Sequence, residues 1–275
     1  MTTPLERPDI GIIGGSGFYS FLADPQKVAV DTPFGAPSAE VAVGEVAGRQ
    51  VAFLPRHGER HQFPPHRVNY RANLWALRAL GVRQVLAPSA VGSLKPELGP
   101  GTFVLPDQVV DRTWGRAHTV YDAEGPVVHI GFADPYCPRG RRTVRSAADD
   151  DEPVDGGTLV VINGPRFSTR AESAWHAAQG WSVVGMTGQP EAGIARELAL
   201  CYTSIAMVTD HDAGIEGVAA VTHAEVLKIF ASNLDRLKAL LLRTVEELGE
   251  AEPDDTATCS CRRVLDGLEL PFALP

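Results

Sequence analysis

The feature that most constrains this chain is an alternation of short β-branched runs with helical stretches. The runs lie at Ile10 to Ile13, Val51 to Leu54, Gln84 to Ala87, Thr158 to Ile162, Val183 to Met186 and Tyr202 to Val208. Such alternation favours a mixed, mostly parallel central sheet that helices cover on both faces. We therefore expect an α/β fold, built as a single domain over residues 1–275 with a short tail from residue 250.

Three helices are the easiest to predict. Asn69 to Leu80 carries apolar residues at helical spacing and is followed by a glycine that suits a C-cap. Pro190 to Leu200 begins with Pro and Glu, which suit a first turn. Thr222 to Leu248 opens with a Thr-x-x-Glu capping box and continues amphipathically. By contrast, the Asp- and Arg-rich stretch Pro138 to Gly157 and the acidic stretch Glu250 to Asp255 are expected to be surface loops.

The net charge limits the classes of partner. The chain has 25 Lys plus Arg against 34 Asp plus Glu, a formal charge of -9, which argues against a nucleic-acid or anionic-membrane surface. No apolar run approaches the roughly 20 residues that span a bilayer, and the N-terminus lacks the layout of a signal peptide. We expect a cytoplasmic protein that holds any anionic ligand locally.

Cysteine is sparse. Four residues, Cys137, Cys201, Cys259 and Cys261, are too few and too unevenly placed for a disulfide scaffold. The pair Cys259-Ser-Cys261 has no His or Cys close by in the sequence, so it is a weak metal signal. We expect it to be a spectator in a polar tail.

A glycine-rich turn follows the first predicted strand, in the stretch IGIIGGSGFYSFL. A dinucleotide fingerprint would have glycine where Ser20 stands, and Asp31 precedes Thr-Pro rather than closing a strand. The G-K-[ST] of a P-loop is absent. Two readings remain: a simple bend of the chain, or a nest of backbone N–H groups around Ser16 that suits a small tetrahedral anion.

Polar residues also follow two further predicted strands. Arg56 and His57 come directly after one run, and Ser89 and Ala90 follow the next. Arginine offers a planar fork for oxyanions, and histidine can donate a hydrogen bond beside it. An Arg-His pair in a loop is often solvated surface, but open α/β sheets place ligands at the carboxyl ends of their strands. We therefore expect three strand ends to converge on one phosphate.

With these segments in view, the chain resembles the trimeric purine nucleoside phosphorylase family, and within it the 5'-methylthioadenosine phosphorylases. The matching stretches, in order, are IGIIGGSGF, DTPFGAPS, PRHGERH, VNYRANLWALRALG, SAVGSL, GTFVLPDQVVDRT, ADPYCP, GPRFSTRAES, GMTGQPEAGIARE and VTDHDAG. The resemblance implies a pentosyltransferase, in which inorganic phosphate attacks C1' of a purine nucleoside and releases the base and a pentose 1-phosphate. It implies phosphate as co-substrate, with no organic cofactor and no metal.

The resemblance also implies roles for particular residues. The phosphate ligands would be Ser16, Arg56, His57, Ser89, the amide of Ala90, and Thr187. The base would meet Phe167, which stacks on it, together with Ser168, Asp210 and Asp212, while Met186 would lie under the ribose. Asp210, with its pKa raised by partial burial and a nearby carboxylate, would protonate N7 as the glycosidic bond breaks. Taken alone, an Asp-x-Asp after an apolar strand is also typical of a helix N-cap.

Two positions bear on which purine is taken. Family members that take 6-oxopurines resemble GP-x-F-E-T followed by T-N, whereas this chain has Ser168 in place of that Glu and Asp210 in place of that Asn. An aspartate accepts from an exocyclic amine and repels a carbonyl oxygen, so adenine fits better. Gly185 departs from the Asn that adenine-specific relatives more often show, which leaves the neighbourhood of the base less certain.

The 5' end of the substrate is less well specified. His223 stands where methylthio-specific relatives have an apolar residue, so it would either bond a 5' oxygen or face solvent in the first turn of its helix. His61, Val226 and Leu227 would line the same pocket. His129 would reach in from a neighbouring subunit, which implies a homotrimer, although a histidine in an apolar run is also typical of a core residue.

Other functions stay open at this point. Within the family, the alternative is a purine nucleoside phosphorylase for 5'-hydroxyl or other 5'-modified nucleosides. A nucleoside hydrolase uses water and no phosphate, so Arg56 and His57 would have no phosphate to bind. A nicotinamide dehydrogenase would need the dinucleotide fingerprint, which this chain does not match. A catalytically silent nucleoside-binding protein would bind the same ligands without turnover.

Overall fold

Strand β1 (Ile10–Gly14) is buried along its whole length between two parallel neighbours, β4 (Arg49–Pro55) and β5 (Gln84–Ser93). The computed structural model describes residues 7–15, 21–149, 152–213, 222–248 and 259–275. Within them, the strand order is β2-β3-β4-β1-β5-β10-β9-β7, and β11 (Cys201–His211) runs parallel to β5 along nearly all of its length. The other strands are β2 (Ala23–Val28), β3 (Val41–Val46), β6 (Phe103–Leu105), β7 (Gln108–Arg112), β8 (Val154–Asp155), β9 (Thr158–Ile162) and β10 (Val183–Gly185).

The sheet is mixed, as the sequence predicts. Parallel pairs form its centre, whereas β3 pairs antiparallel with both β2 and β4, and β10 pairs antiparallel with β5. Every β-branched run expected to be a strand is one. The antiparallel hairpins at the edge come from more polar segments, such as ADPQKV in β2, that the alternation of apolar runs does not reveal.

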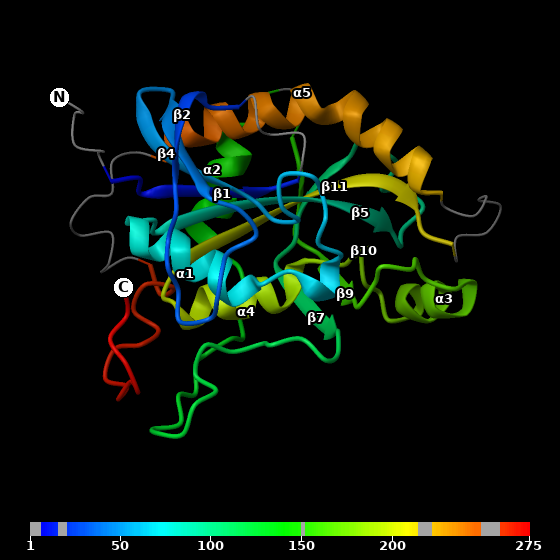
Figure 1. Cartoon of the computed structure of the whole chain (residues 1–275). Coiled ribbons are helices and arrows are strands. Elements are labelled where there is room, and N and C mark those ends of the chain that lie inside the picture. Colours follow the sequence, from blue (N-terminus) through cyan, green and yellow to red (C-terminus); the bar gives the residue numbers. More distant parts are fainter. Residues whose placement is uncertain (1–6, 16–20, 150–151, 214–221, 249–258) are drawn as a thin grey trace.

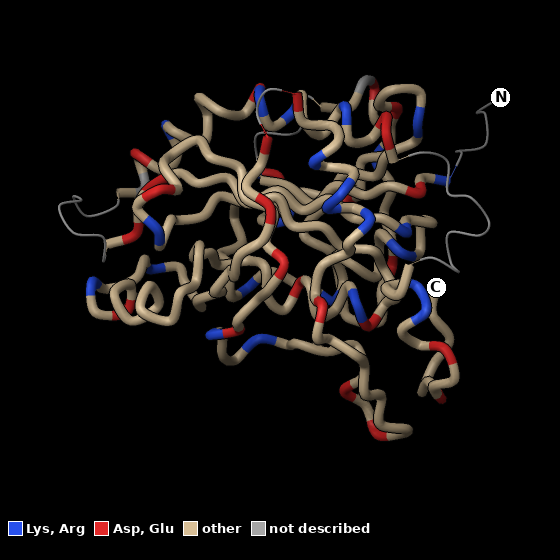
Figure 2. The backbone as a smooth tube through the Cα atoms, turned by 180° about the vertical axis from the view of Figure 1, so that it is seen from behind, with Lys and Arg blue, Asp and Glu red and all other residues tan. Residues whose placement is uncertain are grey.

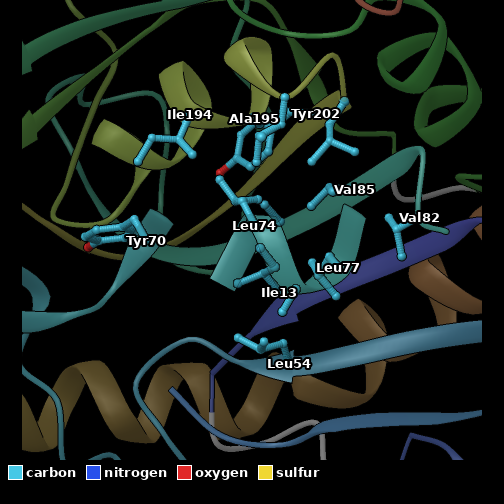
Figure 3. Packing of buried hydrophobic residues seen from close by; sticks show 14 of the residues in the cluster. Ile13, Leu54, Tyr70, Leu74, Leu77, Val82, Val85, Ile194, Ala195 and Tyr202 are labelled. Atoms are coloured by element: carbon cyan, nitrogen blue, oxygen red, sulfur yellow. The ribbon is translucent and has the colours of Figure 1, made fainter. Parts of the chain in front are cut away.

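Helices cover both faces of the sheet (Figure 1). The helices are α1 (Tyr70–Leu80), α2 (Pro138–Ser146), α3 (Arg170–Ala178), α4 (Gly188–Glu197) and α5 (His223–Glu247), with a short 3-10 helix at Pro65–Arg67. Side chains in β1 alternate between the two faces: Ile13 packs with α1 and α4, whereas Ile10 and Ile12 pack with α5. Figure 3 shows the first of these cores, in which Leu74 and Leu77 of α1 approach Ile13.

The predicted helix ends are largely confirmed. Gly81 closes α1 in the left-handed conformation at φ 113°, and the Asn69 side chain accepts from the backbone N–H of Ala72 at its start. Thr222 and Glu225 form the expected capping box of α5. Helix α4 ends at Glu197, before the predicted end at Leu200.

Two stretches were expected to be surface loops. The structure corrects one expectation and does not describe the other stretch. The stretch from Pro138 to Gly157 contains α2 and β8 rather than a surface loop. Only Gly140 and Val144 of α2 are buried, so its sequence has too few apolar positions to predict a helix. The acidic stretch Glu250 to Asp255 lies outside the described residues.

The described part of the C-terminal segment, residues 259–275, packs against the body of the protein. Cys259 and Cys261 are buried beside Cys137 and Cys201, so the expectation that they are spectators in a polar tail is wrong. Further along, Phe272 contacts Trp75 and Tyr121 with ring centroids 5.6 and 5.3 Å apart. This segment is therefore part of the folded structure.

The strand register brings the expected ligand-binding segments to one edge. Gly14 of β1 is paired with Pro55 of β4, so Gly15 and Arg56 follow at the same level of the sheet. Acidic and basic residues are interspersed along the described backbone (Figure 2), as suits a chain with a formal charge of -9. Among the described helices, none combines the length and apolar character needed to cross a membrane.

Candidate active site

A cavity of about 770 Å³ opens at the edge where several strands end. It is bounded by residues that follow β1, β4, β9, β10 and β11, by the second half of β5 and by the first turns of α5. The predicted site residues that line it are Arg56, His57, His61, Ser89, Ala90, Phe167, Ser168, Met186, Thr187, Asp210, Asp212, Val226 and Leu227. The structure thus brings together residues predicted from widely separated sequence blocks.

Three predicted site residues are not among those lining the cavity. Ser16 lies outside the described residues. His223 is the first residue of α5, but its side chain is likewise outside the description. His129 is exposed on the long loop between β7 and α2, and it does not line the cavity of its own chain. Any role for His129 therefore depends on a second subunit.

Arg56 is fixed by a buried ion pair. Its Nε and Nη2 donate to the two carboxylate oxygens of Glu191, each at 2.8 Å, and both side chains are almost completely buried. Burial opposes the positive charge, but Glu191 outweighs it and raises the pKa of Arg56 above its ordinary value. The hydroxyl of Tyr202 also donates to Glu191 at 2.7 Å, so the carboxylate is held from two sides.

The guanidinium lies against the ends of two strands. It donates to the carbonyl of Ile13 in β1 and to the carbonyl of Pro88 in β5, each at 3.1 Å. Together with Glu191, these contacts take all but one of its N–H donors. Arg56 and Gly15 line the same cavity, so the charge is next to the start of the glycine turn.

His57 is neutral at neutral pH. Burial lowers its pKa to about 4, the hydrogen bond to a backbone carbonyl opposes that change, and the positive charge of Arg56 reinforces it. The backbone partner is Phe63, whose carbonyl accepts from Nδ1 at 2.8 Å, so in the neutral ring Nε2 carries the lone pair. The ring stacks on His61 with centroids 4.4 Å apart. His57 thus offers an acceptor rather than the donor that the sequence suggests.

Thr187 lines the cavity just before α4, whose regular turns begin only after the non-helical backbone of Gln189. Thr187 is the N-cap of α4, it is 8% exposed, and its side chain makes no capping hydrogen bond. Ser89 and Ala90 of β5 line the same cavity. A guanidinium, two hydroxyl groups and the amides of strand ends together form an environment that favours a tetrahedral anion.

Asp210 lies at the end of β11, after an irregularity in its pairing. The register with β5 shifts between Val208 and Asp210, so Thr209 is the extra residue of a bulge. Bulges of this kind re-aim the following side chain. A Cβ added to the facing Gly92 would lie 3.0 Å from the Asp210 carboxylate, so the glycine permits this close approach.

The environment of Asp210 favours its protonated form. Burial raises its pKa to about 6, a hydrogen bond from the Thr209 hydroxyl at 2.8 Å opposes the shift, and the charge of Asp212 adds to it. A carboxyl group with a pKa near the working pH can donate a proton and recover it.

Two buried polar atoms at this end of the cavity have no hydrogen-bond partner among the described residues. They are Oδ2 of Asp212 and the hydroxyl of Ser168. Asp212 is only 3% exposed, while its backbone N–H is bound to the carbonyl of Ser93. Because buried polar groups in folded proteins are normally paired, this end of the cavity fits a polar ligand edge.

The loops around Met186 are held by a buried arginine. Nη2 of Arg116 donates to the carbonyls of Met186 and Asn163, each at 2.9 Å, and so ties together the segments that follow β9 and β10. Gly164 has a φ of 59°, and a Cβ there would lie 2.6 Å from the Met186 sulfur. The floor of the cavity thus depends on a glycine at this position.

The far end of the cavity is more apolar. Val226, Leu227 and Phe230 line it from α5, and Leu227 is 54% exposed within the single chain. His61 and Gln62 line it from the loop after β4. This is the part of the cavity where the 5' group of a nucleoside was expected.

Sequence reasoning missed Glu191, Arg116, Gln62 and Phe230. Glu191 follows Pro190 in a predicted first turn, where it is explained by the helix dipole and gives no further signal. Arg116 lies just beyond a matched block, in a stretch without regular periodicity. Only the tertiary structure reveals that Glu191 and Arg116 stabilise the segments that line the cavity.

Comparisons with known proteins agree with this geometry. Residues 9–246 match the model of the phosphorylase superfamily. The chain is 59% identical to a purine nucleoside phosphorylase of Streptomyces coelicolor, with 98% of each chain covered. It is 54% identical to an S-methyl-5'-thioadenosine phosphorylase of Mycolicibacterium smegmatis, covering 97% of this chain and 99% of the relative.

A solved structure has the same fold. The methylthioadenosine phosphorylase of Schistosoma mansoni, in complex with adenine, superposes with a TM-score of 0.84 at 40% identity, covering 90% of this chain and 94% of that one. The family model spans most of the chain, and the similar relatives are covered almost end to end. The chain therefore belongs to the phosphorylase superfamily, among its nucleoside phosphorylases.

Proposed function

We propose that the protein catalyses the phosphate-dependent cleavage of 5'-methylthioadenosine, or of a closely related 5'-substituted adenosine, to adenine and the 5-substituted ribose 1-phosphate. The observation that carries the proposal is the polarity of one cavity. Arg56, His57 and Thr187 line this cavity, and so does Asp210 with its pKa of about 6. An anionic nucleophile and a proton donor are the two groups that this displacement needs.

The phosphate would be bound at the end formed by Arg56, Ser89, the amide of Ala90 and Thr187. The remaining N–H of Arg56 and the hydroxyls of Ser89 and Thr187 bind its oxygen atoms. Neutral His57 accepts a hydrogen bond at Nε2 from the P–OH group, which keeps its proton, and this orients an unprotonated phosphate oxygen toward C1'. Ser16, in the glycine turn, belongs to this set as a sequence-based prediction.

Bond cleavage would then be dissociative. As the bond from C1' to N9 breaks, positive charge develops on the sugar beside the phosphate, and the base gains electron density. Asp210 donates its proton to N7, so the base leaves as neutral adenine. Met186 lies under the ribose and Phe167 stacks on the base, which keeps the reacting atoms aligned.

Adenine fits the polar edge of the cavity better than a 6-oxopurine. Oδ2 of Asp212 and the hydroxyl of Ser168 have no hydrogen-bond partner among the described residues, so we expect them to bind the N6 amine and its neighbouring ring nitrogen. A carbonyl oxygen at C6 would face carboxylates and be repelled. The Schistosoma mansoni relative, which is described in complex with adenine, supports this choice.

A second candidate is a purine nucleoside phosphorylase that accepts a 5'-hydroxyl. His223 is the sequence feature that favours it, and the Streptomyces coelicolor relative carries that name. The apolar side chains of Val226, Leu227 and Phe230 line the cavity and favour a methylthio group over a 5'-hydroxyl.

The working assembly would be a homotrimer whose active sites lie at subunit interfaces. Trp114 is 75% exposed and Val127 77% exposed, and both belong to the loop that carries His129 and extends from the body (Figure 1). Covering these side chains with a second subunit would bury apolar surface and bring His129 to a neighbouring 5' pocket. Phosphate is the co-substrate, no organic cofactor is required, and cytoplasmic location stays a prediction.

The test compares kcat/KM for methylthioadenosine, adenosine and inosine in the presence of phosphate. We expect methylthioadenosine to be best and inosine worst. Inosine as the best substrate would overturn the base assignment, and adenosine as the best would favour the second candidate. Release of free pentose in phosphate-free buffer would indicate a hydrolase, whereas ligand binding without turnover would indicate a silent binding protein.

A further inference from the structure

A second cluster of chemically active side chains lies at the opposite edge of the sheet from the cavity. Cys137, Cys201, Cys259 and Cys261 are all buried, and their sulfur atoms lie within 4.8 Å of one another. Cys201 is the first residue of β11, whereas Asp210 lies near the end of that strand. At about 3.3 Å per residue, this strand separates the two groups by roughly 30 Å.

The sulfur separations fit a shared central ion. Cys259 Sγ lies 3.7 Å from Cys137 Sγ and 3.3 Å from Cys201 Sγ. A disulfide requires a separation of about 2.05 Å. Four thiolates at about 2.3 Å from a tetrahedral zinc ion lie about 3.8 Å from one another. The separations of the Cys137 and Cys201 sulfur atoms from that of Cys259 therefore fit ligands of one shared ion better than a disulfide.

The backbone fixes the segments that carry these thiols. Cys137 is the N-cap of α2, where its sulfur accepts from the N–H of Gly140 at 3.4 Å. Its own N–H donates to the carbonyl of Tyr202 at 2.8 Å, beside Cys201. A Cβ on Gly140 would lie 2.0 Å from the Thr203 hydroxyl, so this close approach of α2 to β11 requires glycine. Outer hydrogen bonds of this kind orient metal ligands and stabilise a thiolate.

Two arginines adjoin the cysteines along the backbone. Arg7, Arg83 and Arg262 are near enough to one another for their positive charges to interact. The carbonyl of Arg83 accepts from the N–H of Cys201 at 2.9 Å, and Arg262 directly follows Cys261.

We propose that Cys137, Cys201, Cys259 and Cys261 bind one Zn²⁺ in a closed tetrahedral site. Binding converts four thiols to thiolates and releases four protons, with no change of oxidation state. Four protein ligands leave no open position for a substrate, so the ion is structural. It connects residues 259–275 to β11 and to the start of α2. A bound zinc ion would differ from the sequence-based expectation of no metal.

The test uses the full chain, purified without chelators and without a histidine tag. Elemental analysis is expected to find about one zinc per chain, and alkylation under denaturing, non-reducing conditions is expected to label all four thiols. Replacing zinc with Co²⁺ is expected to give the visible absorption of tetrahedral cobalt thiolate. Stripping the metal from the folded protein and restoring Zn²⁺ is expected to lower and then recover the Tm by about 10 °C.

Variants separate the site from its surroundings. Cys259→Ser and Cys261→Ser are expected to lose the zinc, whereas Ser260→Ala, between them, is expected to retain it. If the serine variants do not fold, the stripping and restoring of zinc in the unaltered chain still decides the matter. Disulfides in place of the ion, four thiols that bind neither Zn²⁺ nor Co²⁺, or stoichiometric iron or copper would each overturn the proposal.

Discussion

At the scale of single residues, Asp210 connects the shape of the site to its pH dependence. Because burial raises its pKa to about 6, the protonated form dominates below that pH and declines above it. If Asp210 is the general acid, kcat/KM is expected to fall about tenfold for each unit of pH above 6, since the free enzyme must hold the proton. A pH profile of kcat/KM for methylthioadenosine measures this.

The same profile identifies the group. Asp210→Asn is expected to lower kcat roughly 10²- to 10⁴-fold and to remove the decline above pH 6. Asp235→Asn, an exposed aspartate on α5, serves as the control and should keep the original profile. An Asp210→Asn enzyme with an unchanged pH profile would assign the proton to another group.

Glu191 does not line the cavity, yet it controls the residue that faces the phosphate. Glu191→Ala leaves the buried guanidinium of Arg56 without its partner, which is expected to lower the free energy of unfolding by about 3–5 kcal/mol. The KM for phosphate should rise more than the KM for the nucleoside, because the orientation of Arg56 is lost. Denaturant unfolding and phosphate saturation curves measure the two effects.

A double variant distinguishes stability from chemistry. Replacing both partners, as Arg56→Leu with Glu191→Leu, removes the unpaired charge and should restore most of the stability while leaving phosphate binding impaired. Recovery of activity along with stability would contradict a role for Arg56 at the phosphate.

At the scale of secondary-structure elements, the bulge in β11 and the glycine opposite it in β5 set the position of the proton donor. Gly92→Ala would place a Cβ 3.0 Å from the Asp210 carboxylate and 3.3 Å from Val184. The displaced carboxyl is expected to reduce kcat roughly 10- to 100-fold. Gly99→Ala, where the new Cβ meets open space, is the matched control. Equal kcat values for the Gly92→Ala and Gly99→Ala variants would show that the space between Gly92 and the Asp210 carboxylate does not affect catalysis.

Local patterns predicted the elements well where an apolar face is dense. The buried runs of β1, β5 and β11 and the caps of α1 and α5 follow directly from residue type and spacing. Helix α2 was missed because its arginines outnumber its two buried residues, Gly140 and Val144. The bulge at Thr209 was missed because pairing register depends on the partner strand.

The site was predictable to a similar degree. Arg56 and His57 directly follow an apolar run, so their place at a strand end could be inferred, whereas Asp210 was assigned to the site only through the family resemblance. The partners of Arg56 and His57 could not be inferred, because Glu191 and Phe63 contact them through tertiary structure. The tautomer of His57, and hence its role as acceptor, is visible only once the Phe63 carbonyl is located.

At the scale of the whole molecule, we expect the loop between β7 and α2 to form the subunit contact of the proposed homotrimer. Trp114→Glu is expected to weaken a subunit interface by about 2 kcal/mol or more, because a buried tryptophan is a frequent anchor of such contacts. Light scattering should then find smaller species, with a lower kcat/KM for the nucleoside. Leu268→Glu, an exposed leucine in the C-terminal segment, is the control, and a Trp114→Glu protein of unchanged size would exclude this surface.

The contact of Phe272 with Trp75 and Tyr121 also affects how the protein is made. These two aromatic residues are synthesised long before Phe272, so they remain uncovered while translation continues. Domains generally fold as their residues leave the ribosome, but this face of α1 cannot reach its native packing until Phe272 has been synthesised and has left the ribosome. Nascent chains stalled before residue 272 would therefore expose these aromatic side chains to chaperones.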